Sequence, residues 1–400
     1  MDKKPVTILV VASYFKGNRF IEECYKEGCQ VYLLTKLSFK DEPWARQYLK
    51  DVFYMPEFTS RQEVMNAVSY LARNIVFDRI VPMDDYDVEL VASLREHLRI
   101  PGMGDTTARY FRDKLAMRVQ ARDEHIRCPR FEHVLNYGKL DKFMKEVPSP
   151  WFLKPRSEAG AVGIKKINNP QEFWDIVSQL GDEQSHRLLE EYIPGSVYHV
   201  DSIVWDSKIV FSNVSRYVKP PFDIWNFGGV FCTRTLPQGF EEEPEVAEMN
   251  RKIVKAMKLV RGVTHAEFIR SSKDGQVYFL EIAARVGGAN IDMMVEAATG
   301  INLWQEWARL ELACARGEEY TVPERRYDSA SLMVSLSRQA KPDTSAYNDP
   351  EVAWRMDKDH HVGMVLKSPS FNRITELTNS YMERMRQDYM AIEPPKQTAD

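Results

Sequence analysis

The sequence has few cysteines and no long hydrophobic run. Five cysteines occur among 400 residues, none of them in a CxxC spacing, so we expect reduced, buried thiols rather than a disulfide framework or a zinc ribbon. No apolar stretch approaches the roughly 18 residues that a membrane-spanning helix needs. The apolar run from Val6 to Ala12 lacks the length and the cleavage site of a signal peptide, and we interpret it as a first strand. These absences predict a cytoplasmic protein without a membrane partner.

The chain also lacks an excess of charge of either sign. Its 54 lysines and arginines and 58 aspartates and glutamates leave a net charge of −4 at pH 7. A protein that binds nucleic acid or an anionic membrane broadly carries a basic surface, so neither partner is expected, although a local basic site is compatible with this balance. A prior of roughly 150 residues per domain predicts two to three lobes.

A dinucleotide-binding GxGxxG motif is missing after the first strand, where residues 13–17 read SYFKG. The first hundred residues nevertheless alternate continuous apolar segments with amphipathic ones, which is typical of a parallel, doubly wound sheet. A long helix is expected over about 106–125. From about residue 188 the pattern becomes antiparallel and includes a hairpin, 264–270 and 276–283, joined through a KDG turn.

Two glutamates of this hairpin are candidate metal ligands. A turn centred on Asp274 sets Glu267 and Glu281 opposite each other on one face of the sheet. Facing like charges destabilise a sheet unless a cation lies between them, and two carboxylates suit Mg²⁺, which prefers oxygen ligands. The alternative is a solvated sheet face, which the apolar neighbours Phe279 and Ile282 disfavour.

A second candidate site follows the apolar strand that ends at Lys154. The loop from Ser157 to Gly163 is rich in small residues, so its backbone N–H groups can approach a phosphate while the lysine supplies positive charge. By itself the pattern is also typical of an ordinary surface hairpin.

A third segment, residues 188–195, leaves an apolar strand at Glu190 and enters a turn. Its edge could hydrogen-bond a purine and bury the ring against Tyr192 and Ile193. As a bare pattern it is equally an ordinary strand end.

Taken in order, these segments resemble the ATP-grasp superfamily of carboxylate–amine ligases. The resemblance runs from the first strand to about Gly317 and is strongest from Asp113 to Gly300. It rests on seven short segments: FDRIVP (77–82), IPG (100–102), DK (113–114), FLKP (152–155), EEYIPG (190–195), HAEF (265–268) and EIAARVGG (281–288).

The resemblance implies a mixed α/β and α+β fold in four parts. These are a Rossmann-like parallel-sheet domain over 1–108, a small ATP-grasp subdomain with the glycine-rich loop over 109–187, a large subdomain with the metal-binding hairpin over 188–317, and a C-terminal lobe over 318–400.

The resemblance also implies roles for the matching residues. ATP would contact Lys114, Lys154, Ser157, Gly160, Gly163, Glu190, Tyr192 and Ile193. Glu267 and Glu281 would hold Mg²⁺ or Mn²⁺. The catalytic residues would be Lys154, Glu281 and Arg285. The substrates would contact Arg285, Gly287, Gly288 and, in a candidate lid over 216–234, Trp225.

Two positions depart from the family pattern. Ala283 replaces an asparagine that many relatives place two residues after the second metal glutamate, which leaves open whether one or two ions bind. Val197 stands where relatives often have a ribose-binding glutamate. His199 or Asp201 on the same predicted strand would take the ribose instead.

The implied reaction joins a carboxylate to an amine through an acylphosphate, with conversion of ATP to ADP and phosphate. The EIAAR form of the motif resembles the branch that joins L-amino acids into dipeptides, so we expect amino acid substrates and an assembly compatible with a homodimer. Two alternatives stay open: a biotin-carboxylase-like or purine-pathway enzyme acting on bicarbonate or formate, and a nucleotide-binding module without catalysis, which Ala283 favours.

Other polar and aromatic residues have simpler interpretations. Asp84, Asp85 and Asp87 precede a predicted helix, so we expect them to cap it, with a substrate role as the alternative. Trp304 and Trp307 are expected to pack in the core.

Overall fold

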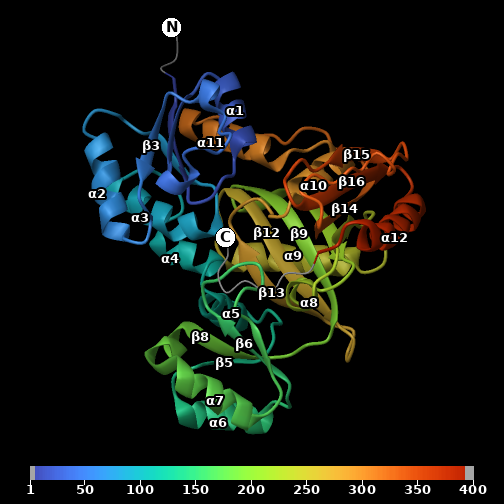
Figure 1. Cartoon of the computed structure of the whole chain (residues 1–400). Coiled ribbons are helices and arrows are strands. Elements are labelled where there is room, and N and C mark those ends of the chain that lie inside the picture. Colours follow the sequence, from blue (N-terminus) through green and yellow to red (C-terminus); the bar gives the residue numbers. More distant parts are fainter. Residues whose placement is uncertain (1–4, 392–400) are drawn as a thin grey trace.

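The computed structural model describes residues 5–391, so the outermost ends of the first and last predicted parts, 1–4 and 392–400, lie outside it. Its N-terminal part is a parallel sheet in the order β3-β2-β1-β4 (Figure 1). The strands are β1 (Thr7–Ala12), β2 (Gln30–Lys36), β3 (Asp51–Met55) and β4 (Arg79–Pro82). Parallel order and apolar strands agree with the doubly wound sheet expected from the sequence.

Helices cover both faces of this sheet, which explains why β1 is apolar throughout. Ile8 and Val10 pack in the cluster that holds α1 (Asn18–Lys26) and α11 (Leu303–Arg316). Leu9 and Val11 belong to the opposite cluster, with α2 (Arg61–Leu71) and α3 (Val88–Leu98).

The small lobe at the bottom of Figure 1 is an antiparallel four-stranded sheet in the order β5-β8-β6-β7. It consists of β5 (Phe131–His133), β6 (Trp151–Pro155), β7 (Lys165–Ile167) and β8 (Arg187–Glu191). Two helices, α6 (Tyr137–Glu146) and α7 (Pro170–Leu180), pack on it through a separate hydrophobic cluster that includes Trp151 and Phe173.

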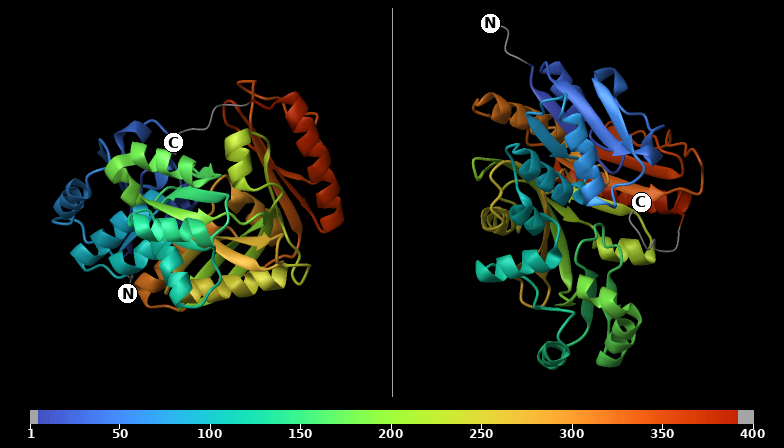
Figure 2. Two further views of the ribbon diagram at one scale, coloured as in Figure 1. Left: turned by 90° about the horizontal axis from the view of Figure 1, so that it is seen from below. Right: turned by 90° about the vertical axis from the view of Figure 1, so that its left-hand side faces the viewer.

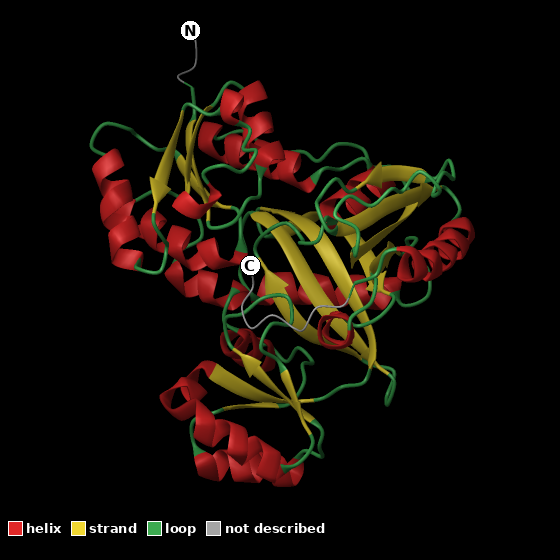
Figure 3. Ribbon diagram, in the orientation of Figure 1, coloured by secondary structure: helices red, strands yellow, loops and turns green. Residues whose placement is uncertain are grey.

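The third sheet has eight strands in the order β13-β12-β9-β10-β11-β14-β16-β15 and dominates the view in Figure 3. The strands are β9 (Gly195–Trp205), β10 (Lys208–Tyr217), β11 (Phe231–Thr235), β12 (Gly262–Ser271), β13 (Val277–Ala283), β14 (Ser329–Leu336), β15 (Val352–Arg355) and β16 (His361–Ser368). The strands between 329 and 368 therefore continue the same sheet rather than forming one of their own.

Helices sandwich this large sheet as well (Figure 2). One face packs against α9 (Glu243–Ala256) and α5 (Lys114–Asp123). The other packs against α10 (Ile291–Thr299) and α11, with Trp304 and Trp307 in that core as predicted. The last helix, α12 (Phe371–Asp388), covers β14 and β16.

Two segments differ from the sequence-based predictions. The single helix over 106–125 is wrong: α4 (Asp105–Ala108) and α5 are separate, because Asp113 accepts hydrogen bonds from the N–H groups of Leu115 and Ala116 and starts a new helix. The segment 216–234 is not a plain loop, since it contains the short helix α8 (Pro221–Phe227).

No helix within residues 5–391 is long and apolar enough to cross a membrane. All five cysteines are free thiols; Cys24, Cys29 and Cys232 are buried, while Cys128 and Cys314 are partly exposed. Burial raises the pKa of Cys29 and of Cys232 to about 12, so these thiols stay protonated at neutral pH.

A buried ion pair connects the N-terminal sheet to α11. Arg79 of β4 places its Nη2 atom 2.6 Å from a carboxylate oxygen of Glu311, and its Nη1 donates to the Pro101 carbonyl. The indole of Trp307 donates to the other oxygen of Glu311. Burial raises the pKa of Glu311, but Arg79 and Arg95 outweigh it and hold that pKa below its usual value.

The replacement Glu311→Gln should destabilise the protein by about 3–5 kcal/mol, because it leaves a buried guanidinium without its counter-charge. Chemical unfolding monitored by tryptophan fluorescence measures this loss. The matched control is Glu146→Gln, which breaks the exposed 3.8 Å pair with Lys142 and should cost less than about 1 kcal/mol. Equal effects of the two replacements would contradict the structural role of the buried pair.

Candidate active site

The two hairpin glutamates face each other across β12 and β13. Glu267 is the register partner of Glu281, as the turn at Asp274 predicts, and the register shifts directly after Glu267. Their side chains are 17% and 32% exposed, so both reach solvent. The ammonium of Lys114 lies 3.1 Å from Glu281. Positive charge therefore already offsets part of the repulsion between the two carboxylates.

Glu267 is fixed by neighbours on the same sheet face. The Tyr217 hydroxyl donates to its Oε1 atom at 2.8 Å, and Nε2 of His265 lies 3.6 Å from that atom. Burial raises the pKa of Glu267, but His265 and Tyr217 outweigh it, so the pKa is lowered and the carboxylate is ionised at neutral pH. An ionised, oriented pair of carboxylates is the oxygen donor set that Mg²⁺ prefers, so the residues present fit this ion.

Behind Glu267 lies a closed polar network of two histidines and an aspartate. Asp201 accepts from Nδ1 of His199 at 2.8 Å and from Nδ1 of His265 at 2.9 Å. Nε2 of His199 pairs with the Thr233 hydroxyl. Burial lowers the pKa of His265, but Asp201 and Glu267 outweigh it and raise the pKa to about 9. A protonated His265 therefore supports the ionised form of Glu267.

The predicted ribose contact of His199 or Asp201 stays a prediction. His199 and Asp201 are both 0% exposed, and both ring nitrogens and both carboxylate oxygens have protein partners. Neither residue presents a free polar atom to a nucleotide in this structure. Their observed contacts orient His265 and, through it, Glu267.

The network also explains Gly287. A Cβ atom at this position would lie 2.9 Å from Oδ1 of Asp201 and 3.0 Å from Nδ1 of His265. Glycine is required there because the loop after β13 passes directly over the buried polar group. At Gly288 a Cβ would meet nothing within 4 Å, so its proposed substrate contact stays a prediction.

Lys154 and Glu190 meet at the centre of the small lobe. The ammonium of Lys154 on β6 lies 2.6 Å from Glu190 on β8, and the guanidinium of Arg118 lies 2.8 Å from the other oxygen of that carboxylate. Burial raises the pKa of Glu190, but Arg118 and Lys154 outweigh it and lower the pKa. Glu190 is thus an ionised acceptor within a buried cluster of two positive charges and one negative.

The glycine-rich loop lies against residues from two other segments. The carbonyl of Ser157 accepts from Arg112, the carbonyl of Glu158 accepts from Lys114, and the Glu158 carboxylate accepts from the Tyr86 hydroxyl at 2.7 Å. These contacts bring Lys114 to both the loop and the metal hairpin.

The loop turns through the left-handed region of backbone space. Gly160 has φ 65° and Gly163 has φ 68°, conformations that favour glycine. A Cβ at Gly163 would also lie 3.0 Å from Pro155. The backbone conformation of the loop therefore explains why glycine stands at these two positions.

Aromatic side chains surround the predicted adenine edge. The ring of Phe152 lies 5.1 Å from that of Tyr192 and 4.7 Å from that of Phe222 on α8. Ile193 packs in a small cluster with Tyr217. Aromatic rings from β6, from the turn after β8 and from α8 therefore lie in contact.

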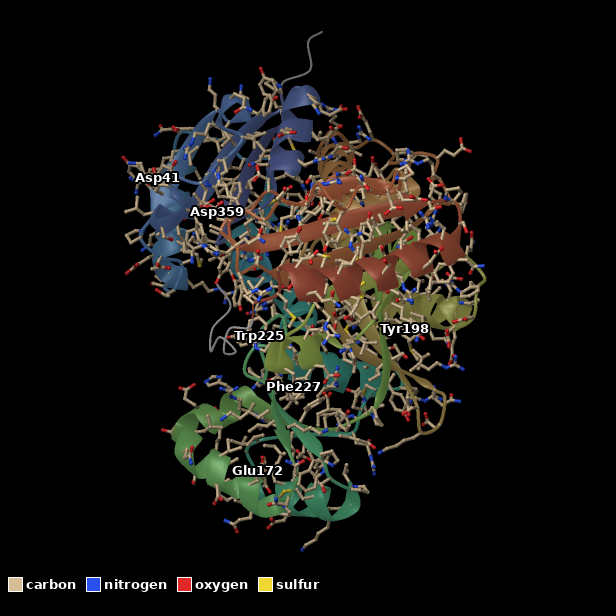
Figure 4. All side chains as sticks on the ribbon, turned by 45° about the vertical axis from the view of Figure 1, so that its right-hand side comes forward. Asp41, Glu172, Tyr198, Trp225, Phe227 and Asp359 are labelled. Carbon is tan, nitrogen blue, oxygen red and sulfur yellow. The ribbon has the colours of Figure 1, made fainter. Side chains whose placement is uncertain are left out.

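Trp225 lies on α8, which sits between the small lobe and the rest of the molecule (Figure 4). Its side chain is partly exposed, and Phe227 on the same helix is 72% exposed. Gly228 and Gly229 end the helix with φ values of 73° and 138°. The position is compatible with a lid, and the contact of Trp225 with substrate stays a prediction.

Arg285 follows the metal hairpin and pairs with the N-terminal domain. Its guanidinium donates to Oδ2 of Asp85 at 2.8 Å from Nε, with Nη2 2.6 Å away. Burial raises the pKa of Asp85, but Arg285 and Arg112 outweigh it and lower the pKa to about 2. Asp84 does cap the short turn 85–87 as predicted, whereas Asp85 belongs to the site.

Comparisons with known proteins identify an ATP-grasp domain within the chain. Residues 147–292 match the model of the ATP-grasp domain. The chain contains an ATP-grasp domain, and the predicted fold class is confirmed. ATP with Mg²⁺ is the cofactor pair of ATP-grasp ligases.

The chain is similar to individual ligases and synthetases of known name. The chain is 27% identical to an L-arginine-specific L-amino acid ligase of Bacillus subtilis over 62% of this chain, and it spans 60% of the length of that relative. The structure of an L-amino acid ligase from Bacillus licheniformis superposes with a TM-score of 0.76, 17% identity and coverage of 98% of this chain and 99% of the other. An N5-carboxyaminoimidazole synthetase from Staphylococcus aureus in complex with ADP gives a TM-score of 0.70, 17% identity and coverage of 96% and 99%.

Several site residues escaped the sequence analysis. Arg118 has a weak signal, since it lies one helical turn after Lys114 and so on the same face of α5. Arg112, Tyr86 and Tyr217 have none, because their partners are 45 to 72 positions away in the chain.

Asp87 is a buried carboxyl at the edge of this site. It accepts from the backbone N–H of Ser13 at 3.1 Å and from the Ser13 hydroxyl. Burial and the nearby Asp84 raise the pKa of Asp87 to about 7. A raised carboxyl pKa contributes stability that is fully present below the unfolded-state pKa of about 4 and is lost as pH rises to about 7.

The replacement Asp87→Asn should remove this pH dependence. The difference in unfolding free energy between wild type and variant should change between about pH 4 and 7, with a slope of at most about 1.4 kcal/mol per pH unit, and stay constant above. Denaturant titrations at several pH values measure it. A difference that is flat from pH 4 to 7 would show that Asp87 titrates normally.

Proposed function

We propose that this protein is an ATP-dependent carboxylate–amine ligase that joins two amino acids through an amide bond. The observation that carries the proposal is the facing pair Glu267 and Glu281 with Lys114 between the pair and the glycine-rich loop. This arrangement suits a nucleoside triphosphate and its metal ion. Similarity to the Bacillus subtilis L-arginine-specific L-amino acid ligase supports amino acids as the substrate class.

The chemistry would proceed in two balanced steps. A carboxylate oxygen of the first substrate attacks the γ-phosphorus of ATP, the bond from phosphorus to the bridging oxygen breaks, and ADP leaves. The amine of the second substrate then attacks the acyl carbon, releases phosphate and gives up a proton as the amide forms. Mg²⁺ held by Glu267 and Glu281 would neutralise charge on the phosphates.

The residues of the chain would bind and orient the reactants. Lys114 and Lys154 supply positive charge toward the phosphates, and the loop 157–163 supplies backbone N–H groups. Arg285 would bind the reacting carboxylate or the transferred phosphoryl group. The adjacent rings of Phe152 and Tyr192 would pack against the adenine ring. Since an acylphosphate hydrolyses readily, α8 and the loop would exclude water.

Arg285 pairs with Asp85, with Nη2 2.6 Å from the carboxylate. A substrate carboxylate would share the guanidinium with Asp85 or replace it. This pair links the N-terminal domain to Arg285, which would bind the reacting carboxylate or the phosphoryl group. The N-terminal domain would thereby help to orient the carboxylate substrate.

A second function, carboxylation of a purine precursor, is favoured by one comparison. The Staphylococcus aureus N5-carboxyaminoimidazole synthetase has the same fold over nearly the whole chain. The substrate that ADP release requires distinguishes the two: amino acids for the proposed ligase, bicarbonate for the alternative.

ADP release should depend on a pair of amino acids and on Glu281. We expect release above background only when two amino acids are present, and Glu281→Gln should reduce the rate roughly 100-fold or more because one metal ligand is lost. A coupled ADP assay over paired amino acids, with mass spectrometry of the products, measures both effects.

The control variant for this assay is Asp274→Asn in the turn of the same hairpin. Asp274 accepts from the Gln276 backbone and the Tyr278 hydroxyl and touches no residue of the site, so its activity should stay within about two-fold of wild type. ADP release with bicarbonate alone, or full activity of Glu281→Gln, would overturn the proposal.

A further inference from the structure

A cavity lies on the small lobe, apart from the proposed nucleotide site. It has a volume of about 700 Å³ and lies between the end of α5, the connection 124–130, β5 and α6. In Figure 1, α5 lies at the junction of the small lobe with the large sheet, β5 lies within the small lobe, and α6 lies at its lower end. None of the proposed ATP, metal or substrate residues lines it. Its size falls in the range of small-molecule sites.

The lining of this cavity is strongly basic, although the chain as a whole is acidic. Five cationic side chains line it: Arg122, Arg127, Arg130, Lys139 and Lys142. The lining holds two carboxylates, Glu132 and Glu146. Two acids outside the lining, Asp123 and Glu191, pair with Arg122 and Arg130. Against a net charge of −4 for the whole chain, this is a local concentration of positive charge.

Some of these cations have no acidic partner. Within residues 5–391, neither Arg127 nor Lys139 forms an ion pair with a carboxylate. The pair of Lys142 with Glu146 is exposed and 3.8 Å long, so it contributes little. Arg127 and Lys139 are therefore the lining cations best able to bind an anion.

Aromatic rings orient two of the guanidinium groups. Arg122 lies 5.6 Å from the ring centre of Phe131, and Arg127 lies 5.7 Å from that of Tyr278. Stacking of this kind restricts the planar head groups before any ligand arrives. An arginine held in this way suits a phosphate, which it can contact through two parallel hydrogen bonds.

The floor of the cavity is apolar. The buried side chains among its lining residues are Ile126, Pro129, Phe143 and Val147. A floor of this kind favours a ligand that has an apolar or aromatic body besides its charge. An inorganic ion alone would leave this surface in water.

We propose that this cavity binds a phosphorylated small molecule with an aromatic or apolar body, at a site distinct from the nucleotide cleft. The phosphate contacts Arg127 and Lys139, and the body packs on Ile126 and Phe143. The site does not depend on the proposed ligase activity.

The cavity is connected to the catalytic strands through the backbone. The carbonyl of Arg127 accepts from the N–H of Phe279, two residues before Glu281 on β13. Arg130 forms two hydrogen bonds with Glu191, the neighbour of Glu190 on β8. A ligand here therefore contacts the segment that joins the small lobe to the metal-binding strand.

Phenyl phosphate is a suitable probe, because it combines one aromatic ring with one phosphate. Titration calorimetry on the full-length protein, with and without saturating MgADP, should show one site that MgADP does not block. The affinity should be about ten-fold or more above that for inorganic phosphate and should fall with salt.

The double variant Arg127→Gln/Lys139→Gln should weaken phenyl phosphate binding about ten-fold or more. The matched control is Lys145→Gln/Lys273→Gln, which removes the same charge from exposed positions outside the lining and should leave binding unchanged. MgADP affinity should be unchanged in both variants, which separates failure of this site from failure of the proposed ATP site.

Three results would overturn the proposal. These are no saturable binding of phenyl phosphate, equal loss in both double variants, and full competition by MgADP. Binding of a single-stranded oligonucleotide without binding of phenyl phosphate would also overturn it in favour of a nucleic-acid surface.

Discussion

The site depends on the repulsion between two carboxylates that adjacent strands place face to face. Glu267 and Glu281 are register partners on β12 and β13, a pairing that a sheet does not tolerate without positive charge nearby. The chain supplies some of it through Lys114 and through a protonated His265. The remaining negative charge is what suits this pair to the metal ion that we propose.

Much of the remaining polar architecture maintains this charge balance. Asp201 lies between His199 and His265 and, with the hydroxyl of Tyr217, keeps Glu267 ionised and oriented. The same principle operates in the small lobe, where Arg118 and Lys154 stabilise the buried Glu190. In both places a carboxylate is retained in a buried position because its partners are fixed by neighbouring strands or by a packed helix.

The sequence predicts those features that are local in the chain. The facing of Glu267 and Glu281 follows from strand alternation and one turn, and the parallel N-terminal sheet follows from continuous apolar strands. The prediction of a single helix over 106–125 is wrong because the side chain of Asp113 caps α5 and so starts a second helix. Hydrophobic periodicity does not report such a break, since α4 and α5 keep apolar residues at helical spacing on either side of it.

Contacts between lobes could not be predicted in this way. Asp85 was interpreted as a capping residue because it precedes a helix, but the fold places it against Arg285, 200 positions away. His199 and Asp201 are candidates for a ribose contact because they share a predicted strand with Val197. The pairing of β9 with β12 places them beside His265 and Glu267, which the sequence alone does not indicate. Sequence spacing identifies which side chains share a face, whereas the partner across that face depends on how the lobes assemble.

The candidate site therefore draws on the N-terminal domain, the small lobe and the large sheet. Lys114 at the start of α5 contacts the metal hairpin and the glycine-rich loop, Tyr86 of the N-terminal domain holds the same loop, and Asp85 beside it holds Arg285. Three of these contacts, Lys114 with Glu281, Tyr86 with Glu158 and Arg285 with Asp85, cross between these parts, so no single part contains all of the proposed groups. A reaction that passes through a water-sensitive acylphosphate benefits from this division, because the groups needed for phosphoryl transfer come together only when the lobes that exclude water are in contact.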